Sequence, residues 1–436
     1  MIAKPSFEHL QGIIPKCNKD LNFWIGLYHL YGIHTYPHLG VDLVISLLLV
    51  QDGKICEFSH RLRTLQINEF SWNCLINGYA KHGDPRNVLF LFDRMREDFL
   101  YPSGYAIVSV LNACAKLKAY KTGKEIHAHL LIHGLLGSNP FISTALVDMY
   151  AKCGMIAEAE EVFRMLPHRN TVTWNALIAG YVRCELSAKA IHCFRQMREQ
   201  GASPDAVTYA CIFKALSHIE FSDVEASIGE FIHEIHAEVE RKGILYANMV
   251  VGTCLVEMFV QWGMLAKAHE VFDEIQGHNV ISWNALMAGY AQLGNDTDVV
   301  ELFNKMIRED IEPDPVSFTI VLNVCNHSGQ LDKGQMYIQM ISTTYSITPT
   351  LVHHICMVDL FGRAGNFEIA VAMIKKVPIS DYLPIWISLL GACQKWQNVK
   401  LGLLAFENVV GWKKNHAAAY VCMGNIYAMQ KEENSI

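Results

Sequence analysis

A repeated stretch of about 35 residues is the feature that most limits what this chain can fold into. The segment TVTWNALIAGYVRCELSAKAIHCFRQMREQGASPD occupies residues 171–205, and the related segments EFSWNCLINGYAKHG and VISWNALMAGYAQLG begin at Glu69 and Val280. The three tryptophans of these segments are 102 and 109 residues apart: Trp72, Trp174 and Trp283. Repetition at so regular a spacing indicates an array of one structural unit rather than a single globular core.

Each copy has the apolar pattern of a helical hairpin. In the first half of the 171–205 segment, apolar residues fall at i, i+3, i+4 and i+7, one stripe of an α-helix: Trp174, Leu177, Ile178 and Tyr181. A second stripe follows the connection at residues 183–187: Ala190, Phe194 and Met197. Gly201 and Pro204 then predict the end of the hairpin. Because one hairpin cannot cover its own apolar face, it must stack on its neighbours. The sequence therefore predicts an all-α fold, a right-handed superhelical α-solenoid of stacked helix–turn–helix repeats.

Two further kinds of unit complete a triplet. A 36-residue unit spans residues 104–139, and a 31-residue unit spans residues 140–170. The lengths of these two units and of the 35-residue unit add up to the tryptophan spacing of 102 residues. The second triplet carries a seven-residue excess around FSDVEASIGE, which predicts a longer loop between two helices. The expected organisation has four parts: two degenerate repeats at 1–68, three triplets at 69–381, and helical segments at 382–415 and 416–436.

Composition narrows the classes of protein that the chain can belong to. Hydrophobic residues make up 51% and charged residues 18%, which excludes disorder and suits helices buried on two sides. A net charge of −7 argues against a uniformly basic nucleic-acid binder, but it is compatible with one basic face.

The longest aliphatic run, Val41–Val50, is too short to span a bilayer, so no membrane association is expected. Thirteen cysteines without a C-x-x-C pair predict buried, reduced thiols and no metal site. No pattern for a cofactor or a small-molecule substrate stands out.

The motifs of the three units resemble those of a known family. WNALIAGY, LNACAK and LVDMYAKCG, in units of 35, 36 and 31 residues, closely resemble plant pentatricopeptide repeat (PPR) proteins of the class with P, L and S repeats. The resemblance covers residues 69–381. Residues 382–415 resemble the E1 motif of such proteins at Trp386 and residues 390–393, and residues 416–436 resemble the start of an E2 motif, cut short. The W-x-x-L-G-x-x-Y pattern of tetratricopeptide repeats is absent.

This resemblance implies sequence-specific binding of single-stranded RNA in a mitochondrion or chloroplast, one base per repeat. In the family, the fifth and last residues of a repeat meet the base edge, and the second residue packs against the base faces. The implied reading pairs are Asn73 with Ser103 for cytosine, Thr144 with Asn170 and Thr253 with Asn279 for adenine, and Asn175 with Asp205 and Asn284 with Asp314 for uracil. The implied base-stacking residues are Phe70, Phe141, Val172, Val250 and Ile281.

The remaining repeats depart from the family's code. The L repeats carry Val108, Ala210 and Thr319 at the fifth place, and the last S repeat pairs Ile355 with Asp381, so their bases stay unassigned. The expected target, from 5′ to 3′, is C-n-A-U-n-A-U-n-n. A plainer interpretation stands beside this one. Asp residues before a helix are often caps, and the tryptophans, by their periodicity, face the core rather than RNA.

The E-type tail implies a more specific role. Such chains select the site of organellar cytidine-to-uridine RNA editing and recruit a deaminase or other editing-complex proteins in trans. The tripeptides His236-Ala237-Glu238 and His218-Ile219-Glu220 imitate the H-x-E of zinc deaminases, but no C-x-x-C follows, so we expect no enzymatic activity. Two alternatives stay open: a factor for organellar RNA stability, splicing or translation, and a protein-interaction solenoid, which would need no base-reading pairs.

Overall fold

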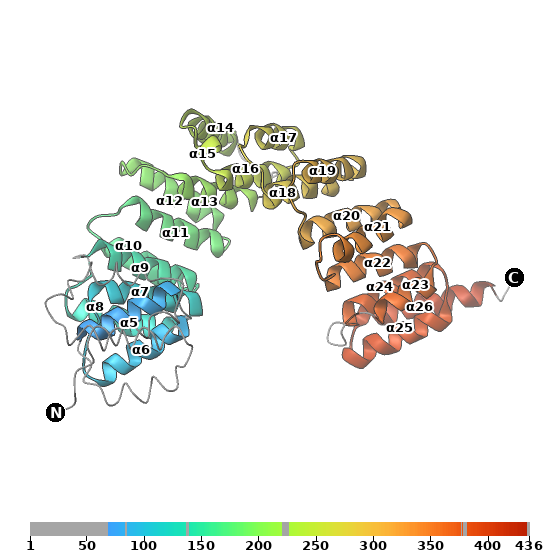
Figure 1. The fold of residues 1–436 in the computed structure, drawn as a ribbon, viewed down its shortest axis with the longest axis horizontal. Coiled ribbons are helices and arrows are strands. Elements are labelled where there is room, and N and C mark those ends of the chain that lie inside the picture. The colour runs from blue at the N-terminus through green and yellow to red at the C-terminus, as the bar shows by residue number, and fades with distance from the viewer. Residues whose placement is uncertain are drawn as a thin grey trace, which may run out of the picture. The chain divides into compact units, whose positions relative to one another are not determined.

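A computed structural model of the chain describes residues 69–82, 85–136, 139–219, 226–375, 377 and 382–433. Within these residues the chain forms the helices α5 to α26 and no strand (Figure 1). The all-helical fold class predicted from the repeats is therefore confirmed. The two degenerate repeats expected at 1–68 lie outside the described residues, as does Asp381.

The chain divides into two compact units, residues 1–203 and 204–436, each a stack of helical hairpins. The helices of unit 1 are α5 (Glu69–His82), α6 (Pro85–Glu97), α7 (Gly104–Leu117), α8 (Tyr120–Ile132), α9 (Pro140–Lys152), α10 (Ile156–Met165), α11 (Thr171–Arg183) and α12 (Ser187–Glu199). Those of unit 2 are α13 (Ala206–Ser217), α14 (Ala226–Arg241), α15 (Ile244–Ala247), α16 (Met249–Gln261), α17 (Leu265–Glu274), α18 (Val280–Gln292), α19 (Asp296–Arg308), α20 (Pro315–Ser328), α21 (Leu331–Thr343), α22 (Leu351–Arg363), α23 (Phe367–Ile374), α24 (Tyr382–Lys395), α25 (Val399–Trp412) and α26 (Ala417–Glu433).

The first helix of each repeat begins where the sequence pattern starts a unit. In the 171–205 repeat, α11 begins at Thr171 and α12 begins at Ser187, directly after the expected connection. Asn170 caps α11, because its side chain accepts a hydrogen bond from the backbone N–H of Thr173. Gly201, with φ of 75°, adopts the left-handed conformation that ends the hairpin.

Within each unit the first helices form one layer and the second helices the other. The first helices α7, α9 and α11 pack in sequence in unit 1, as do α16, α18, α20 and α22 in unit 2 (Figure 1). The second helices α6, α10 and α17 each pack onto the first helix of their own repeat and of the next. Trp174 is 1% exposed, and the Phe163 ring meets it edge-on, with ring centroids 4.7 Å apart. Trp283 and Phe272 repeat this contact at 4.8 Å. The prediction that the tryptophans belong to the core is confirmed.

The seven-residue excess of the second triplet falls between α13 and α14, mostly on residues 220–225, which are outside the described part. No helix of the described residues is both long and apolar enough to cross a bilayer. Ten cysteines whose side chains the structure describes are free thiols. Several are buried, and burial raises the pKa of the Cys114 thiol to about 12, which makes that thiol unreactive at neutral pH.

Candidate nucleic-acid interface

One stripe of every first helix faces away from the core. On α11 the second, fifth, ninth and thirteenth residues are Val172, Asn175, Ala179 and Arg183, which share one side of a helix with 3.6 residues per turn. Val172 and Arg183 are exposed, whereas Asn175 is only 7% exposed. Since the first helices stack in one layer, their stripes form a continuous surface within each unit. On this surface the second residues are exposed, and the polar fifth residues lie deeper between them.

The second residue of all nine repeats from 69 to 381 is an exposed apolar side chain. The five residues predicted to stack on bases are among them, from Phe70 at 41% exposed to Phe141 at 71%. Sequence reasoning missed four more, all at the second place of the L repeats and the last S repeat: Tyr105, Val207, Val316 and Val352. The signal that would have found them is the same one: an apolar residue directly after the first residue of the helix. A line of exposed apolar side chains, one in every repeat, marks a candidate interaction surface.

The reading pair Asn284 and Asp314 is brought together. The Asn284 side-chain amide donates from Nδ2 to Asp314 Oδ1 at 2.9 Å, and Asn284 Oδ1 accepts from the Ser317 hydroxyl at 2.6 Å. Asp314 Oδ1 also accepts the Ser317 backbone N–H at 2.8 Å, which caps α20. The pair therefore presents one N–H donor beside one carboxylate acceptor, Asp314 Oδ2.

The pair Thr144 and Asn170 is joined through a third residue. Thr144 Oγ1 lies 2.8 Å from Thr173 Oγ1, and the Thr173 hydroxyl donates to Asn170 Oδ1 at 2.8 Å. Thr173 is 2% exposed, while Asn170 is exposed. The three side chains form a chain of hydrogen bonds beneath the surface of the stripe.

Two further pairs are held differently. The Ser103 backbone N–H donates to Asn73 Oδ1 at 2.8 Å, so that pair is linked through the main chain. Thr253, which is 6% exposed, donates its hydroxyl to the Met249 carbonyl at 2.9 Å, and Asn279 caps α18 through Ser282. Each of these four pairs therefore has its own hydrogen-bonding arrangement, and the members of the Thr253 and Asn279 pair bond within their own helices.

The fifth predicted pair, Asn175 and Asp205, has one member in each unit, and each is described alone. Asn175 lies buried on α11, and exposed Asp205 caps α13 in a capping box with Thr208. The last residues of all five predicted pairs are helix N-caps, so the plainer interpretation of Asp205 and Asp314 as caps is correct. At Asp314, capping uses one carboxylate oxygen, Oδ1, and leaves Oδ2 for a ligand.

The fifth residues of the other repeats offer little hydrogen-bonding capacity. Val108, Ala210 and Ile355 are apolar, and the Thr319 hydroxyl donates to the Pro315 carbonyl at 2.8 Å. The bases at these repeats stay unassigned.

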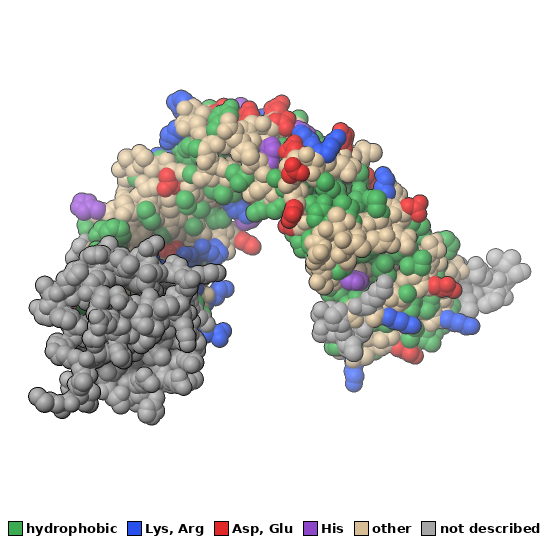
Figure 2. Space-filling model, viewed as in Figure 1, with side chains coloured by type: hydrophobic (Ala, Val, Ile, Leu, Met, Phe, Trp, Pro, Cys, Tyr) green, Lys and Arg blue, Asp and Glu red, His purple; other side chains and the backbone are tan. Residues whose placement is uncertain are grey.

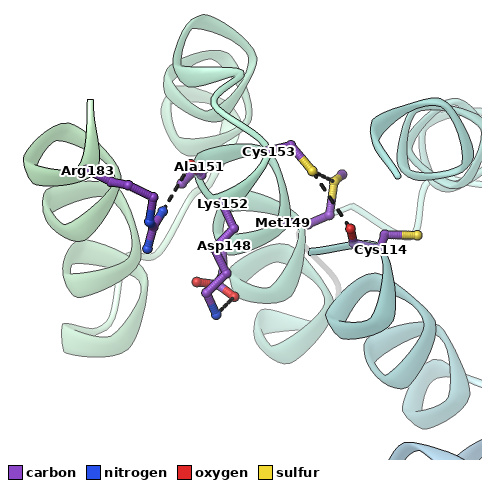
Figure 3. A network of polar contacts seen from close by, with 7 residues as sticks. All are labelled: Cys114, Asp148, Met149, Ala151, Lys152, Cys153 and Arg183. Atoms are coloured by element: carbon purple, nitrogen blue, oxygen red, sulfur yellow. Dashed lines mark hydrogen bonds and ion pairs between the residues drawn. The ribbon is translucent and has the colours of Figure 1, made fainter. Parts of the chain in front are cut away.

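Basic side chains end several first helices. In unit 1 the thirteenth residues of four successive repeats are exposed cations: Lys81, Lys116, Lys152 and Arg183. Figure 3 shows two of them: Lys152 pairs with Asp148 at 2.6 Å, and Arg183 donates to the Ala151 carbonyl at 3.1 Å. They also offset the negative end of each helix dipole. Figure 2 shows Lys and Arg side chains following one another along one edge of unit 1, and acidic and basic side chains intermixed over α17 and α19.

The two H-x-E tripeptides occupy different places in their repeat. His236 pairs with Glu240 at 3.2 Å, and Glu238 pairs with Lys242 at 2.8 Å, both along α14. No group of three or more metal-ligating side chains gathers in the described part of the chain, and Glu220 lies outside it. His236-Ala237-Glu238 therefore lies on a second helix, whereas His218 is the C-cap of the first helix α13.

The comparisons agree with this repeat architecture. The model of the PPR repeat family matches residues 169–218 and 278–327, and that of the PPR repeat matches 70–98, 141–170 and 253–280. A chloroplastic pentatricopeptide repeat-containing protein of Arabidopsis thaliana is 34% identical over 83% of this chain and 50% of its own length. A putative mitochondrial one from the same plant is 30% identical over 84% of this chain and 57% of its own length. The chain spans about half the length of the relatives it matches.

Solved structures show the same fold. The crystal structure of the pentatricopeptide repeat protein PPR10 from maize has a TM-score of 0.62 at 16% identity, covering 88% of this chain and 59% of PPR10. PPR10 in complex with an 18-nt psaJ RNA element has a TM-score of 0.59 at 17% identity, covering 86% and 60%. The stacked hairpins are thus those of an α-solenoid, as the repeat pattern predicted. With its repeat motifs, its relatives and its fold in agreement, this chain belongs to the PPR repeat family.

Proposed function

We propose that this protein binds single-stranded RNA with one base per repeat along the first-helix stripe. The observation that carries the proposal is the combination of exposed apolar second residues in nine successive repeats with partly buried polar pairs between them. Unstacked bases have apolar faces and polar edges, so they fit such an alternation. That a structural relative, PPR10, is known in complex with RNA supports the proposal.

The Asn284 and Asp314 pair matches the edge of uracil. The free N–H of Asn284 Nδ2 can donate to the uracil O4 carbonyl, and Asp314 Oδ2 can accept the uracil N3–H. Cytosine presents an acceptor at N3 and a donor at N4, so it places a lone pair against the carboxylate. Since a good bidentate contact discriminates by about 1–3 kcal/mol, the pair would favour uracil by tenfold or more.

Thr144 and Asn170 suit adenine by the same reasoning. With Asn170 Oδ1 engaged by Thr173, the Asn170 Nδ2 is directed outward as a donor to adenine N1, and Thr144 Oγ1 can accept from the N6 amino group. The basic thirteenth residues, on the same stripe, supply the contacts to phosphate that any RNA sequence can use.

The E1-like residues 382–415 and E2-like residues 416–436 favour a role in selecting sites of organellar cytidine-to-uridine editing, with a deaminase or other editing protein acting in trans. Helices α24 and α25 form a hairpin there and α26 packs against both. The relatives named chloroplastic and mitochondrial support one of these organelles as the compartment. A factor for RNA stability, splicing or translation in the same organelles would use the identical binding surface.

Substitution at the fourth base tests base reading. Asn175→Ala should weaken binding to RNA with U at the fourth position of C-n-A-U-n-A-U by about tenfold, and it should leave binding to RNA with other bases there nearly unchanged. Asn295→Ala, an exposed asparagine at the start of α19 away from the stripe, is the matched control. Equal weakening on every RNA would refute base reading at this repeat. No binding to any RNA would favour a protein-interaction solenoid.

A further inference from the structure

In two of the reading pairs, a buried hydroxyl at the third residue of the repeat that follows contacts both members of the pair. Ser317, the third residue of α20, is 0% exposed, and Thr173, the third residue of α11, is 2% exposed. Each contacts both members of the pair in front of it. Neither is exposed enough to meet RNA, so any effect on base preference must act through the pair.

Proton counting shows what Ser317 does. Its hydroxyl accepts the Asp314 backbone N–H at 3.2 Å and has one proton to donate. Asn284 Oδ1 at 2.6 Å is a nearer acceptor than Asp314 Oδ1 at 3.0 Å. Donation to Asn284 anchors the oxygen end of that amide inside the protein, so Nδ2 is the end that meets Asp314 and the stripe. The orientation of the reading amide is thus determined by a side chain behind it.

Thr173 holds its pair by the same logic. Its hydroxyl donates to Asn170 Oδ1, so at the contact with Thr144 it must accept, and the Thr144 proton points inward. Asn170 Oδ1 also accepts the Thr173 backbone N–H at 2.8 Å. Thr144 is left presenting lone pairs and Asn170 is left presenting Nδ2. Reversing either orientation would exchange donor for acceptor at the base edge.

The bridge is not a by-product of helix capping. Ser282 is the third residue of α18 and caps with Asn279 in the same way, yet its hydroxyl donates to the Asn279 carbonyl at 2.9 Å while Thr253 bonds to Met249. In α7 the third residue is Ala106, which has no hydroxyl, although Ser103 caps that helix. The cap is present in all four repeats, whereas the hydroxyl bridge to the fifth residue is present in two.

We propose that Ser317 and Thr173 are positioning residues for base recognition: each fixes the donor and acceptor orientation of the reading pair in the preceding repeat. The proposal rests on the RNA-binding function proposed above. It makes recognition of one base depend on three side chains from two successive repeats, because the third residue belongs to the following helix.

Ser317→Ala removes the bridge and the hydrogen bond from the Asp314 backbone N–H, but it nearly keeps the volume and it keeps the hydrogen bond from the Ser317 backbone N–H to Asp314 Oδ1. Binding is measured to RNAs that contain C-n-A-U-n-A-U and differ only at the seventh base, U or C, or only at the third base, A or G. We expect the preference for U at the seventh base to fall from about tenfold to below threefold, with the preference at the third base unchanged. The conservative variant Ser317→Thr keeps a hydroxyl at this position, as Thr173 does in the equivalent place on α11, so it should retain the preference. Thr173→Ala should show the opposite pattern, losing the preference at the third base alone.

The outcomes separate the two proposals. If the wild-type protein prefers U at the seventh base and Ser317→Ala prefers it equally, Ser317 is only a cap and the positioning role is overturned. If the wild-type protein shows no preference at either base, base reading itself fails, and the positioning role with it. A readout without RNA checks the orientation directly. In Ser317→Ala, the side-chain NH₂ resonances of Asn284 should shift and exchange faster with water, with the thermal melting of the protein retained. Unchanged Asn284 resonances would also overturn the proposal.

Discussion

The two units carry the same stripe with different chemistry. In unit 1 the second residues include the aromatic side chains Phe70, Tyr105 and Phe141, whereas in unit 2 they are all aliphatic. The thirteenth residues of unit 1 are four cations, whereas the first four of unit 2 are His218, Gln261, Gln292 and His327. Aromatic stacking and phosphate contacts stabilise any RNA sequence alike. If the proposed function is correct, we therefore expect unit 1 to supply most of the RNA affinity and unit 2 to contribute chiefly through its reading pairs.

Removing the cations of unit 1 should have the largest effect. Simultaneous substitution by Gln of Lys81, Lys116, Lys152 and Arg183 is expected to weaken binding to every RNA by about 100-fold at 0.1 M salt. If all four contact phosphates, it should also reduce the slope of log affinity against log salt by about 3. The measurement is a salt titration of RNA binding. A matched variant removes four cations from the second helices of the same unit: Lys121, Lys124, Lys189 and Arg195. An equal loss of RNA affinity in this control would show that the effect comes from net charge and not from the position of the cations.

Truncating second residues compares stacking in the two units. Phe141→Ala should weaken binding by about tenfold whichever base lies at its repeat, because aromatic stacking contributes about 1–3 kcal/mol per base and tolerates every base. Ile281→Ala should cost about threefold, since an aliphatic side chain offers less area to a base face. Binding of RNAs that vary at the third and seventh bases measures both. A larger loss for Ile281→Ala would reverse the proposed division of affinity between the units.

Replacing the N-cap residue of a unit 2 reading pair by the one found in a unit 1 pair should change the base that the repeat prefers. Asp314→Ser gives unit 2 the Asn and Ser pair that unit 1 has at Asn73 and Ser103, and we expect the preference at the seventh base to change from U to C by about tenfold. Ser is a good N-cap, so α20 should remain stable. Competition between the U and C forms of the RNA gives the result. Retained preference for U would mean that Asp314 is a cap and nothing more.

The prediction with the smallest effect on RNA binding concerns stability. A Cβ at Gly180 would lie 2.7 Å from Ala151 Cβ, which cannot rotate away. A Cβ at Gly289 would lie 2.6 and 2.8 Å from the two Cγ atoms of Val260, and rotation of that branched side chain leaves one of them in contact. Gly180→Ala and Gly289→Ala should therefore each destabilise their own unit by about 1–2 kcal/mol, after the gain in helix propensity. Denaturant melts of both variants measure this. A loss in only one variant would show that the other stack can adjust to the added methyl group.

The sequence predicted most of the fold because helical periodicity and helix ends are local properties. Trp174 and Trp283 could be assigned to the core from their spacing, and the starts of α11 and α18 from the repeats themselves. Tyr105 and Val352 carry the same signal as the five predicted stacking residues, since each is an apolar side chain directly after the first residue of its repeat. The roles of Ser317 and Thr173 could not be predicted, because they depend on which acceptor a hydroxyl meets in the neighbouring repeat. Ser282, in the equivalent place, makes a different hydrogen bond.

The most direct test of one base per repeat is to sequence the RNA that the purified protein selects from a random pool. We expect enrichment of RNAs that contain C-n-A-U-n-A-U in that order. The base should be most strongly selected at the third, fourth, sixth and seventh positions and little selected at the second and fifth. Enriched RNA with no common sequence, or with its informative positions at another spacing, would contradict it.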